Sequence, residues 1–293
     1  MNSSYQIITE VACGLSQDFL KQAEFLTVPM GFTIGDQNYA QSPEKETPDL
    51  HSIYQLLRTA SSAAAVTFDT SDLIEFLRPA LARGKDLLYI GLSDAFGQTW
   101  HNATRALANL QREFPTRRIE AVNSMTLSAG QGLLLQRLSK LQQEGASLLE
   151  AKGWAEANAP HIHSLFAVGN SDFLVRSFKG SFPNRQNQIL QMTEGQLLLK
   201  EQSENSQERI SCLFKALQES ASLGTIQSVS IVHADCEGDA QILKQMIQKQ
   251  NLTDMISVSF LEPIFGCEFG PDTLGLFYEV NTETSQTQNT KIM

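Results

Sequence analysis

The sequence lacks the features that mark several large functional classes. No stretch approaches the roughly 20 consecutive apolar residues that a membrane-spanning helix needs. The four cysteines are scattered and form no C-x-x-C pair, which argues against a zinc site and against a disulfide framework. No P-loop, G-x-G-x-x-G, H-E-x-x-H or G-x-S-x-G sequence occurs, so the common nucleotide, zinc-protease and esterase signatures are missing.

Positive charge is also scarce. The net charge is −10, and the densest basic cluster is the short run Thr116-Arg117-Arg118, so we expect no nucleic-acid partner. His161 and His163 stand two apart without a nearby carboxylate or cysteine, and we expect neither a metal nor a cofactor. The first ten residues show no basic region followed by an apolar one, so we expect no signal peptide and a cytoplasmic location.

The clearest pattern is a strand, a polar turn and a helix over residues 86–110. Leu87 to Leu92 is an apolar run of the length of a buried strand, and a helical pattern follows from Trp100. The turn between them lies at the carboxyl end of the strand, where free N–H groups and hydroxyls can hold an anion. We interpret Ser93, Gly97 and Thr99 as a ligand head-group site. The alternative is an ordinary turn in which Thr99 caps the helix.

A second corner of the same kind follows directly. Residues 118–122 are predicted to form a strand, 123–128 a turn and 129–141 a helix. Successive corners of a parallel sheet lie at one edge, where open α/β sheets bind ligands, so Ser124 and Ser128 join the candidate site. The alternative for each serine is a helix cap or a turn residue bonded to its own backbone.

The chain of 293 residues is long enough for about two domains. Alternating strands and helices over residues 1–160 predict an N-terminal α/β domain with a parallel sheet between layers of helices. Residues 161–280 predict a C-terminal α+β domain with a mixed sheet and helices on one side. Residues 262–280 are expected to supply closing strands around a Gly/Pro corner, and 281–293 form a polar tail.

The order of these corners resembles the DegV family of bacterial fatty-acid-binding proteins from about Tyr5 to Val280. The S-S-x-L-S-G-T-Y corner of the family resembles residues 93–100, and its D-S-x-x-x-S-x-G-x-G corner resembles residues 123–132. Its opening T-D-S-S is similar to Thr9-Glu10-Val11-Ala12, and its closing H-T-G-P-G-x-L-G-L is similar to residues 268–276.

This resemblance implies a two-domain lipid carrier of DegV-like fold that is not an enzyme. It implies a long-chain fatty acid or other acyl lipid buried between the domains and a fatty acid kinase as partner. The family threonine that holds the lipid carboxylate falls on Ala65, so Thr67 is expected to substitute for it. The family G-G-R segment falls on residues 177–179, which keep Lys179 as a cation, and Glu268 replaces the histidine near the head group.

The change to Glu268 matters because two carboxylates about 4 Å apart repel by roughly 4 kcal/mol at an effective dielectric constant near 20. Two alternatives therefore stand beside the lipid carrier. In the first alternative, the chain is a degenerate relative that acts as an interaction or regulatory protein, and Phe68, Phe178 and Phe269 fill the pocket. The other alternative is a hydrolase or phosphotransferase that uses Glu268 or Asp94 as a base.

Overall fold

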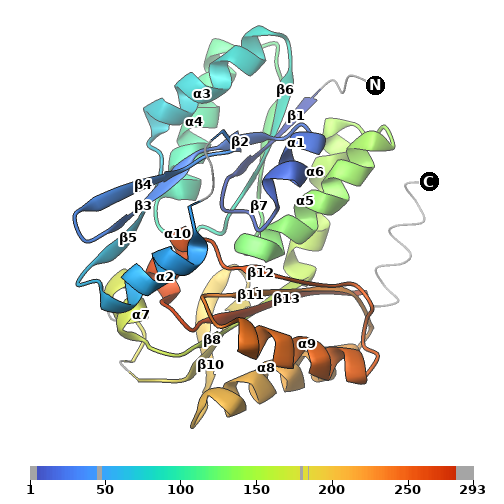
Figure 1. Cartoon of the computed structure of the whole chain (residues 1–293). Coiled ribbons are helices and arrows are strands. Elements are labelled where there is room, and N and C mark those ends of the chain that lie inside the picture. The colour runs from blue at the N-terminus through green and yellow to red at the C-terminus, as the bar shows by residue number, and fades with distance from the viewer. Residues whose placement is uncertain (1–4, 45–47, 179–180, 184, 282–293) are drawn as a thin grey trace. The chain divides into compact units, whose positions relative to one another are not determined.

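The computed structural model describes residues 5–44, 48–178, 181–183 and 185–281 (Figure 1). The chain divides into two compact units. The first takes its described residues from 1–48, 64–160 and 194–196, and the second from 49–63, 161–193 and 197–293. One division point follows Pro160, where the sequence predicts a domain boundary. Residues 49–63, which were expected in the first domain, pack with the second unit instead.

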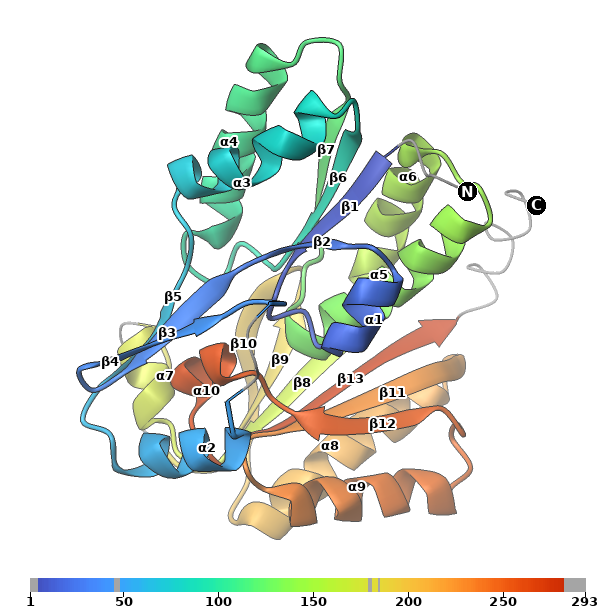
Figure 2. The same cartoon turned by 45° about the horizontal axis from the view of Figure 1, so that its top comes forward.

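The first unit is built on a parallel sheet with the strand order β2-β1-β6-β7. Its central strands are apolar runs without alternation, because helices cover both faces of the sheet. Figure 2 shows α3 and α4 on one face and α5 and α6 on the other. The elements are β1 (Tyr5–Glu10), α1 (Gln17–Gln22), β2 (Leu26–Val28), α3 (Thr70–Ala82), β6 (Asp86–Gly91), α4 (Thr99–Glu113), β7 (Ile119–Asn123), α5 (Ser128–Gln143) and α6 (Leu148–Asn158).

Two helices of this unit begin with reciprocal side-chain caps. Asp69 accepts the N–H of Asp72 while Asp72 accepts the N–H of Asp69, and Ser147 pairs with Glu150 in the same way. The local sequence pattern predicts Ser71 as the cap of α3, which is wrong: the cap is Asp69, two residues earlier, and α3 starts at Thr70.

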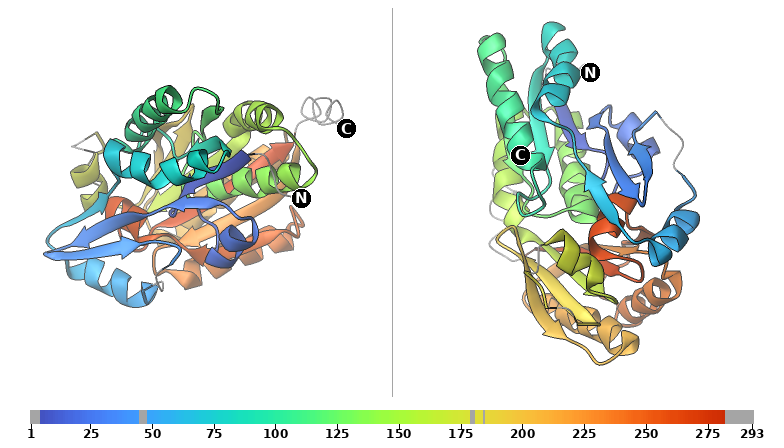
Figure 3. Two further views of the ribbon diagram at one scale, coloured as in Figure 1. Left: turned by 90° about the horizontal axis from the view of Figure 1, so that it is seen from above. Right: turned by 90° about the vertical axis from the view of Figure 1, so that its left-hand side faces the viewer.

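A small sheet with the order β4-β3-β5 completes this part of the chain. Its strands are β3 (Met30–Ile34), β4 (Gln37–Gln41) and β5 (Ala63–Val66). The sequence Gly35-Asp36, after a segment that is predicted to be extended, indicates a hairpin, and β3 and β4 pair antiparallel across these residues (Figure 3). The rings of Phe32 and Tyr39 stack at 4.8 Å on one face of the hairpin.

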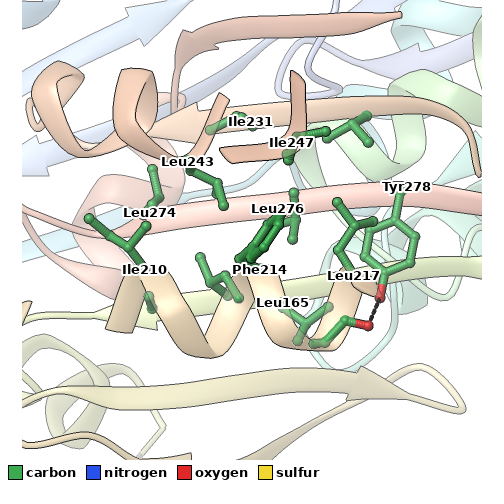
Figure 4. Close-up of a cluster of buried hydrophobic side chains, with 14 of the residues drawn as sticks. Leu165, Ile210, Phe214, Leu217, Ile231, Leu243, Ile247, Leu274, Leu276 and Tyr278 are labelled. Atoms are coloured by element: carbon green, nitrogen blue, oxygen red, sulfur yellow. Dashed lines mark hydrogen bonds between the residues drawn. The ribbon is translucent and has the colours of Figure 1, made fainter. Parts of the chain in front are cut away.

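The second unit contains a six-stranded mixed sheet with the order β10-β9-β8-β13-β11-β12. Two long helices, α8 and α9, pack on it and enclose a core of aliphatic side chains around Phe214, Leu243 and Leu276 (Figure 4). The predicted α+β class with a mixed sheet is confirmed. The elements are β8 (Ile162–Val168), β9 (Gln188–Thr193), β10 (Gln196–Gln202), α8 (Ser206–Ala221), β11 (Thr225–His233), α9 (Glu237–Lys249), β12 (Ile256–Phe260) and β13 (Leu274–Asn281).

The segment before β13 differs from the prediction. Residues 263–269 form the helix α10 (Pro263–Phe269) rather than a strand, with Pro263 at its first turn and Gly270 after it at φ +83°. A further short helix, α7 (Asp172–Ser177), and a 3₁₀ turn, η1 (Ala159–His161), carry no clear sequence pattern. Residues 282–293 of the expected tail lie outside the described part of the chain.

The helix α2 (Leu50–Thr59) belongs to the second unit although its sequence lies early in the chain. Tyr54 is fully buried and donates a hydrogen bond to the carbonyl of Leu261 at 2.8 Å. Arg58 binds both carboxylate oxygens of Asp272, at 2.5 and 2.8 Å, and reaches Asp235 at 3.3 Å. These contacts attach α2 to the loops at one end of the mixed sheet.

We expect Tyr54→Phe to lower the free energy of unfolding by about 1–2 kcal/mol, because it removes a buried hydrogen bond without leaving a large cavity. Urea denaturation measures this change. Tyr39→Phe is the matched control, since the Tyr39 hydroxyl bonds an exposed glutamine, and its effect should be near zero. Equal effects of the two changes would contradict this account of α2.

Candidate functional site

The first candidate corner follows β6 and is centred on Ser93. This side chain is fully buried, and its hydroxyl donates to the carbonyl of Gly195 and accepts from the N–H of Ala95 at 3.3 Å. Residues 194–196 belong to the first unit, so this bond lies within it. The Ser93 hydroxyl is therefore engaged by the protein's own backbone in this structure.

The start of α4 carries no cap from a side chain. Thr99 is the first residue of the helix and Gln98 precedes it, so the interpretation of Thr99 as the cap is wrong. The first N–H groups of an α-helix have no partner within the helix, and they favour negative charge. Gly97 lies just before them at φ +69° and is exposed, with open space where a side chain would stand.

Thr67 and Thr99 are brought together by the fold. Thr67 follows β5 and Thr99 begins α4, and their hydroxyl oxygens lie 2.9 Å apart. Thr99 is buried and Thr67 is half-buried. The prediction that Thr67 reaches the head-group corner therefore agrees with the geometry of this pair, although the sequence alone gave no measure of the distance.

The second corner, which follows β7, is bonded directly to the first. The N–H of Ser93 donates to the carbonyl of Thr126 at 2.8 Å, and the N–H of Ser124 donates to that of Gly91 at 2.9 Å. The Ser124 hydroxyl contacts the backbone of Thr126 in a local turn, as its alternative interpretation predicts. Ser128 is buried at the start of α5 with φ +48°.

A buried polar network that the sequence analysis did not identify supports both corners. Glu10, at the end of β1, is fully buried and accepts hydrogen bonds from Tyr89, from the N–H of Leu92 and from Gln131. Burial raises the pKa of Glu10, and these hydrogen bonds oppose the shift. An acidic residue at a strand end and a glutamine in the following helix were the available signals, and neither predicts contact without the fold.

Two cavities of the first unit are lined in part by residues of the candidate site. One of about 570 Å³ is lined mostly by apolar side chains and also by Thr67, Asn38 and Asp72, and its volume falls within the roughly 300–1,000 Å³ typical of small-molecule sites. Its apolar lining includes Val28, Met30, Phe32, Val66, Phe68, Leu73 and Phe76. The other, of about 490 Å³, lies beside both corners and is lined by Asp94, Trp100, Asn123 and Met125 among others.

Two further residues of the predicted site belong to other parts of the sequence. Glu268 belongs to α10 of the second unit and is half-buried. Burial raises the pKa of Glu268 to about 7, and a hydrogen bond with Ser177 opposes the rise. Lys179 lies outside the described residues. The expected position of an acyl chain between the two domains stays a prediction.

Over the part of the chain that the structure describes, no helix combines the length and the apolar character needed to cross a bilayer. Nor does the same part of the chain bring together three or more histidine, cysteine or acidic side chains in a metal-binding arrangement.

Comparison with known proteins identifies the family. The model of the family described as uncharacterised protein, DegV family, matches residues 4–182 and 185–281. The chain belongs to the DegV family. A DegV domain-containing protein of Clostridium perfringens is 23% identical over 288 residues, which cover 95% of this chain and 98% of that relative.

Solved DegV structures share the fold. A fatty-acid-binding DegV family protein from Thermus thermophilus superposes with a TM-score of 0.82 at 21% identity, covering 95% of this chain and all of the other. DegV from Bacillus subtilis, described as a fatty acid binding protein, gives 0.80 at 18% identity, with coverage of 96% and 100%. The predicted fold class is thereby confirmed.

We expect Glu268→Gln to stabilise the protein at pH 8 and to have little effect on stability at pH 4. A carboxyl group with a raised pKa binds its proton more tightly in the folded state, so stability falls as the pH rises through about 7. Urea denaturation at both pH values measures the difference, and Glu75→Gln, at an exposed position, is the control. An effect of Glu268→Gln that is independent of pH would contradict the assigned shift.

Proposed function

We propose that the protein binds a fatty acid or a similar acyl lipid, with the lipid carboxylate at the corner that begins α4. The observation that carries the proposal is the pair of hydroxyls of Thr67 and Thr99 at a helix start that no side chain caps. Solved members of the family are described as fatty acid binding proteins, which supports the same ligand class here.

This corner suits a carboxylate on physical grounds. Hydroxyl groups can donate to an anion, and the N–H groups of the first turn of α4, which no side chain caps, add favourable partial charge. Gly97 leaves space for a ligand to approach the backbone. Ser93 and Ser124 support the corner, since their backbone N–H groups bond the carbonyls of Thr126 and Gly91 and so join the two turns, and we place Ser128, at the start of α5, in the same supporting role.

Burial of the acyl chain supplies most of the expected affinity. Each buried methylene group contributes roughly 0.8 kcal/mol, so a long chain offers on the order of 10 kcal/mol before the costs of association. The apolar cavity that Thr67 also lines supports the proposal, because it offers apolar surface beside the hydroxyl pair.

Glu268 and Lys179 adjust the head-group chemistry in this proposal. A Glu268 carboxyl with a pKa of about 7 is partly protonated at neutral pH, which reduces its repulsion of a lipid carboxylate. Lys179 supplies a cation at the position of the family arginine.

The finer role that we propose is that of a cytoplasmic carrier without catalytic activity, which presents its lipid to a fatty acid kinase. The four cysteines are free, in keeping with a reducing compartment. Acyl phosphate formation from the loaded protein, ATP and a fatty acid kinase tests the handover.

A second candidate function follows from the aromatic side chains of the second unit. Phe269 is fully buried and stacks on Phe166 at 4.6 Å, with Phe178 at 6.4 Å. These rings favour the alternative of a filled pocket, in which the protein acts through interactions rather than through a lipid. Native mass spectrometry that finds no co-purified lipid, with no thermal stabilisation by fatty acids, would support this alternative.

We expect Thr99→Val to weaken fatty acid binding by about 10- to 100-fold, because a hydrogen bond to a charged group contributes about 1.5–3 kcal/mol. Thr67→Val should have a similar effect. Isothermal titration with dodecanoic acid measures both. Thr104→Val is the matched control, since its hydroxyl bonds a carbonyl of its own helix.

Unchanged affinity in both Thr67→Val and Thr99→Val would show that this corner does not hold the head group. A loss of equal size in Thr104→Val would point to a general effect on α4 rather than to lost contact with the lipid.

A further inference from the structure

Glu10 ends the strand β1, next to the point of the first sheet where the order of strands reverses. β1 has β2 on one side and β6 on the other, so the order of strands reverses between β1 and β6. Open α/β sheets bind ligands outside the carboxyl ends of their strands at such a point. Glu10 is the last residue of β1, at this edge, and its side chain is fully buried.

Hydrogen bonds to Glu10 come from two other elements. The hydroxyl of Tyr89 in β6 donates to its Oε1, as does the N–H of Leu92 at 3.3 Å. The amide of Gln131 in α5 donates to Oε2 at 2.7 Å. Leu92 directly precedes Ser93, and Gln131 lies in the first turn of the helix that follows the second corner. The Glu10 carboxylate thus bonds a residue next to each of the two corners.

Gln131 strengthens this arrangement. Its Nε2 also lies 2.9 Å from the hydroxyl of Thr9 and 2.9 Å from the carbonyl of Ile90, while its Oε1 is buried without a hydrogen-bond partner. A buried oxygen without a partner is costly, so the orientation of the amide is determined by what its nitrogen bonds. The Glu10 carboxylate is one of the acceptors that the Gln131 amide nitrogen bonds.

We propose that the ionised Glu10 carboxylate is a positioning residue, which holds the Ser93 corner and the start of α5 in the geometry that receives the acyl head group. This inference rests on the proposed function. Glu10 itself is buried beneath the corner and does not need to contact the lipid.

The ionised form suits this site because the N–H of Leu92 and the NH₂ of Gln131, which contact the carboxylate, can only donate. Tyr89 is the ionisable group in contact with it, and burial keeps the pKa of Tyr89 well above its usual value, so this hydroxyl stays protonated. α5 contributes the uncharged amide of Gln131, and Leu92, which directly follows β6, contributes a backbone N–H. Protonation places an O–H on the Glu10 carboxyl group, and neither the N–H of Leu92 nor the NH₂ of Gln131 can accept from it, so protonation loosens the corner.

Stability and binding then respond to acid in opposite directions. Burial raises the pKa of Glu10, so between its ordinary and raised values the folded state binds more protons than the unfolded state. Acidification through that range therefore stabilises the fold, while it weakens the hydrogen bonds that position the corner. A merely structural role would lower stability and affinity together.

The experiment uses dodecanol as its main probe, because this ligand does not ionise, and dodecanoic acid as the second. Affinity and the free energy of unfolding are measured from pH 8 to pH 5. We expect the affinity of the unaltered protein for dodecanol to fall about tenfold on acidification, as one hydrogen bond of roughly 1.4 kcal/mol is lost. Glu10→Gln should bind weakly at every pH, and the stability of the unaltered protein relative to Glu10→Gln should rise on acidification.

Two other variants sharpen the test. Tyr89→Phe removes a hydrogen bond that lowers the Glu10 pKa, so the midpoint of the affinity change should move to higher pH. Glu75→Gln, at an exposed glutamate of α3, should reproduce the profile of the unaltered protein. The profile of the unaltered protein and that of Tyr89→Phe decide the question even if Glu10→Gln does not fold.

A flat affinity profile of the unaltered protein, or full affinity of folded Glu10→Gln at pH 8, would overturn the inference and leave the proposed function standing. If neither probe binds the unaltered protein at pH 8, the proposed function fails, and the inference fails with it.

Discussion

A buried carboxylate, Glu10, is the constraint on which the first unit depends. A buried polar group needs hydrogen-bond partners, and here these are Tyr89, Leu92 and Gln131. These hydrogen bonds hold the end of β1 against the end of β6 and the start of α5. Both serine corners begin within a few residues of these contacts, so their geometry follows from the needs of one buried group.

The second unit depends on different contacts, which bury one face of its sheet and attach a helix from early in the sequence. Its mixed sheet buries one face under α8 and α9, and α2 from early in the sequence attaches through Tyr54 and Arg58. Gly266 allows this attachment, because a side chain there would lie 2.7 Å from the ring of Tyr54. Local sequence patterns predict that this segment is a helix, but they do not predict that it packs with the second unit.

Much of the fold could be predicted because its signals are local. The apolar run from Leu87 to Leu92 and the periodic helix after it predict a buried strand and its helix, and both are observed. Residues 263–269 were missed because a short segment that contains Pro263 and Gly266 and is followed by Gly270 fits a turn as well as a helix. The helix exists through packing on α2 and α7, which no local pattern records.

The sequence by itself determined the alternation of strands and helices, the family and the residue types at the two corners, because these depend on spacing and composition. Only the tertiary structure decided that Thr67 meets Thr99, that Ser93 bonds the backbone of Gly195, and that Glu10 lies beneath both corners. Such contacts join residues from 32 to 121 positions apart, and distance along a chain carries no information on distance in space until the sheet order is known.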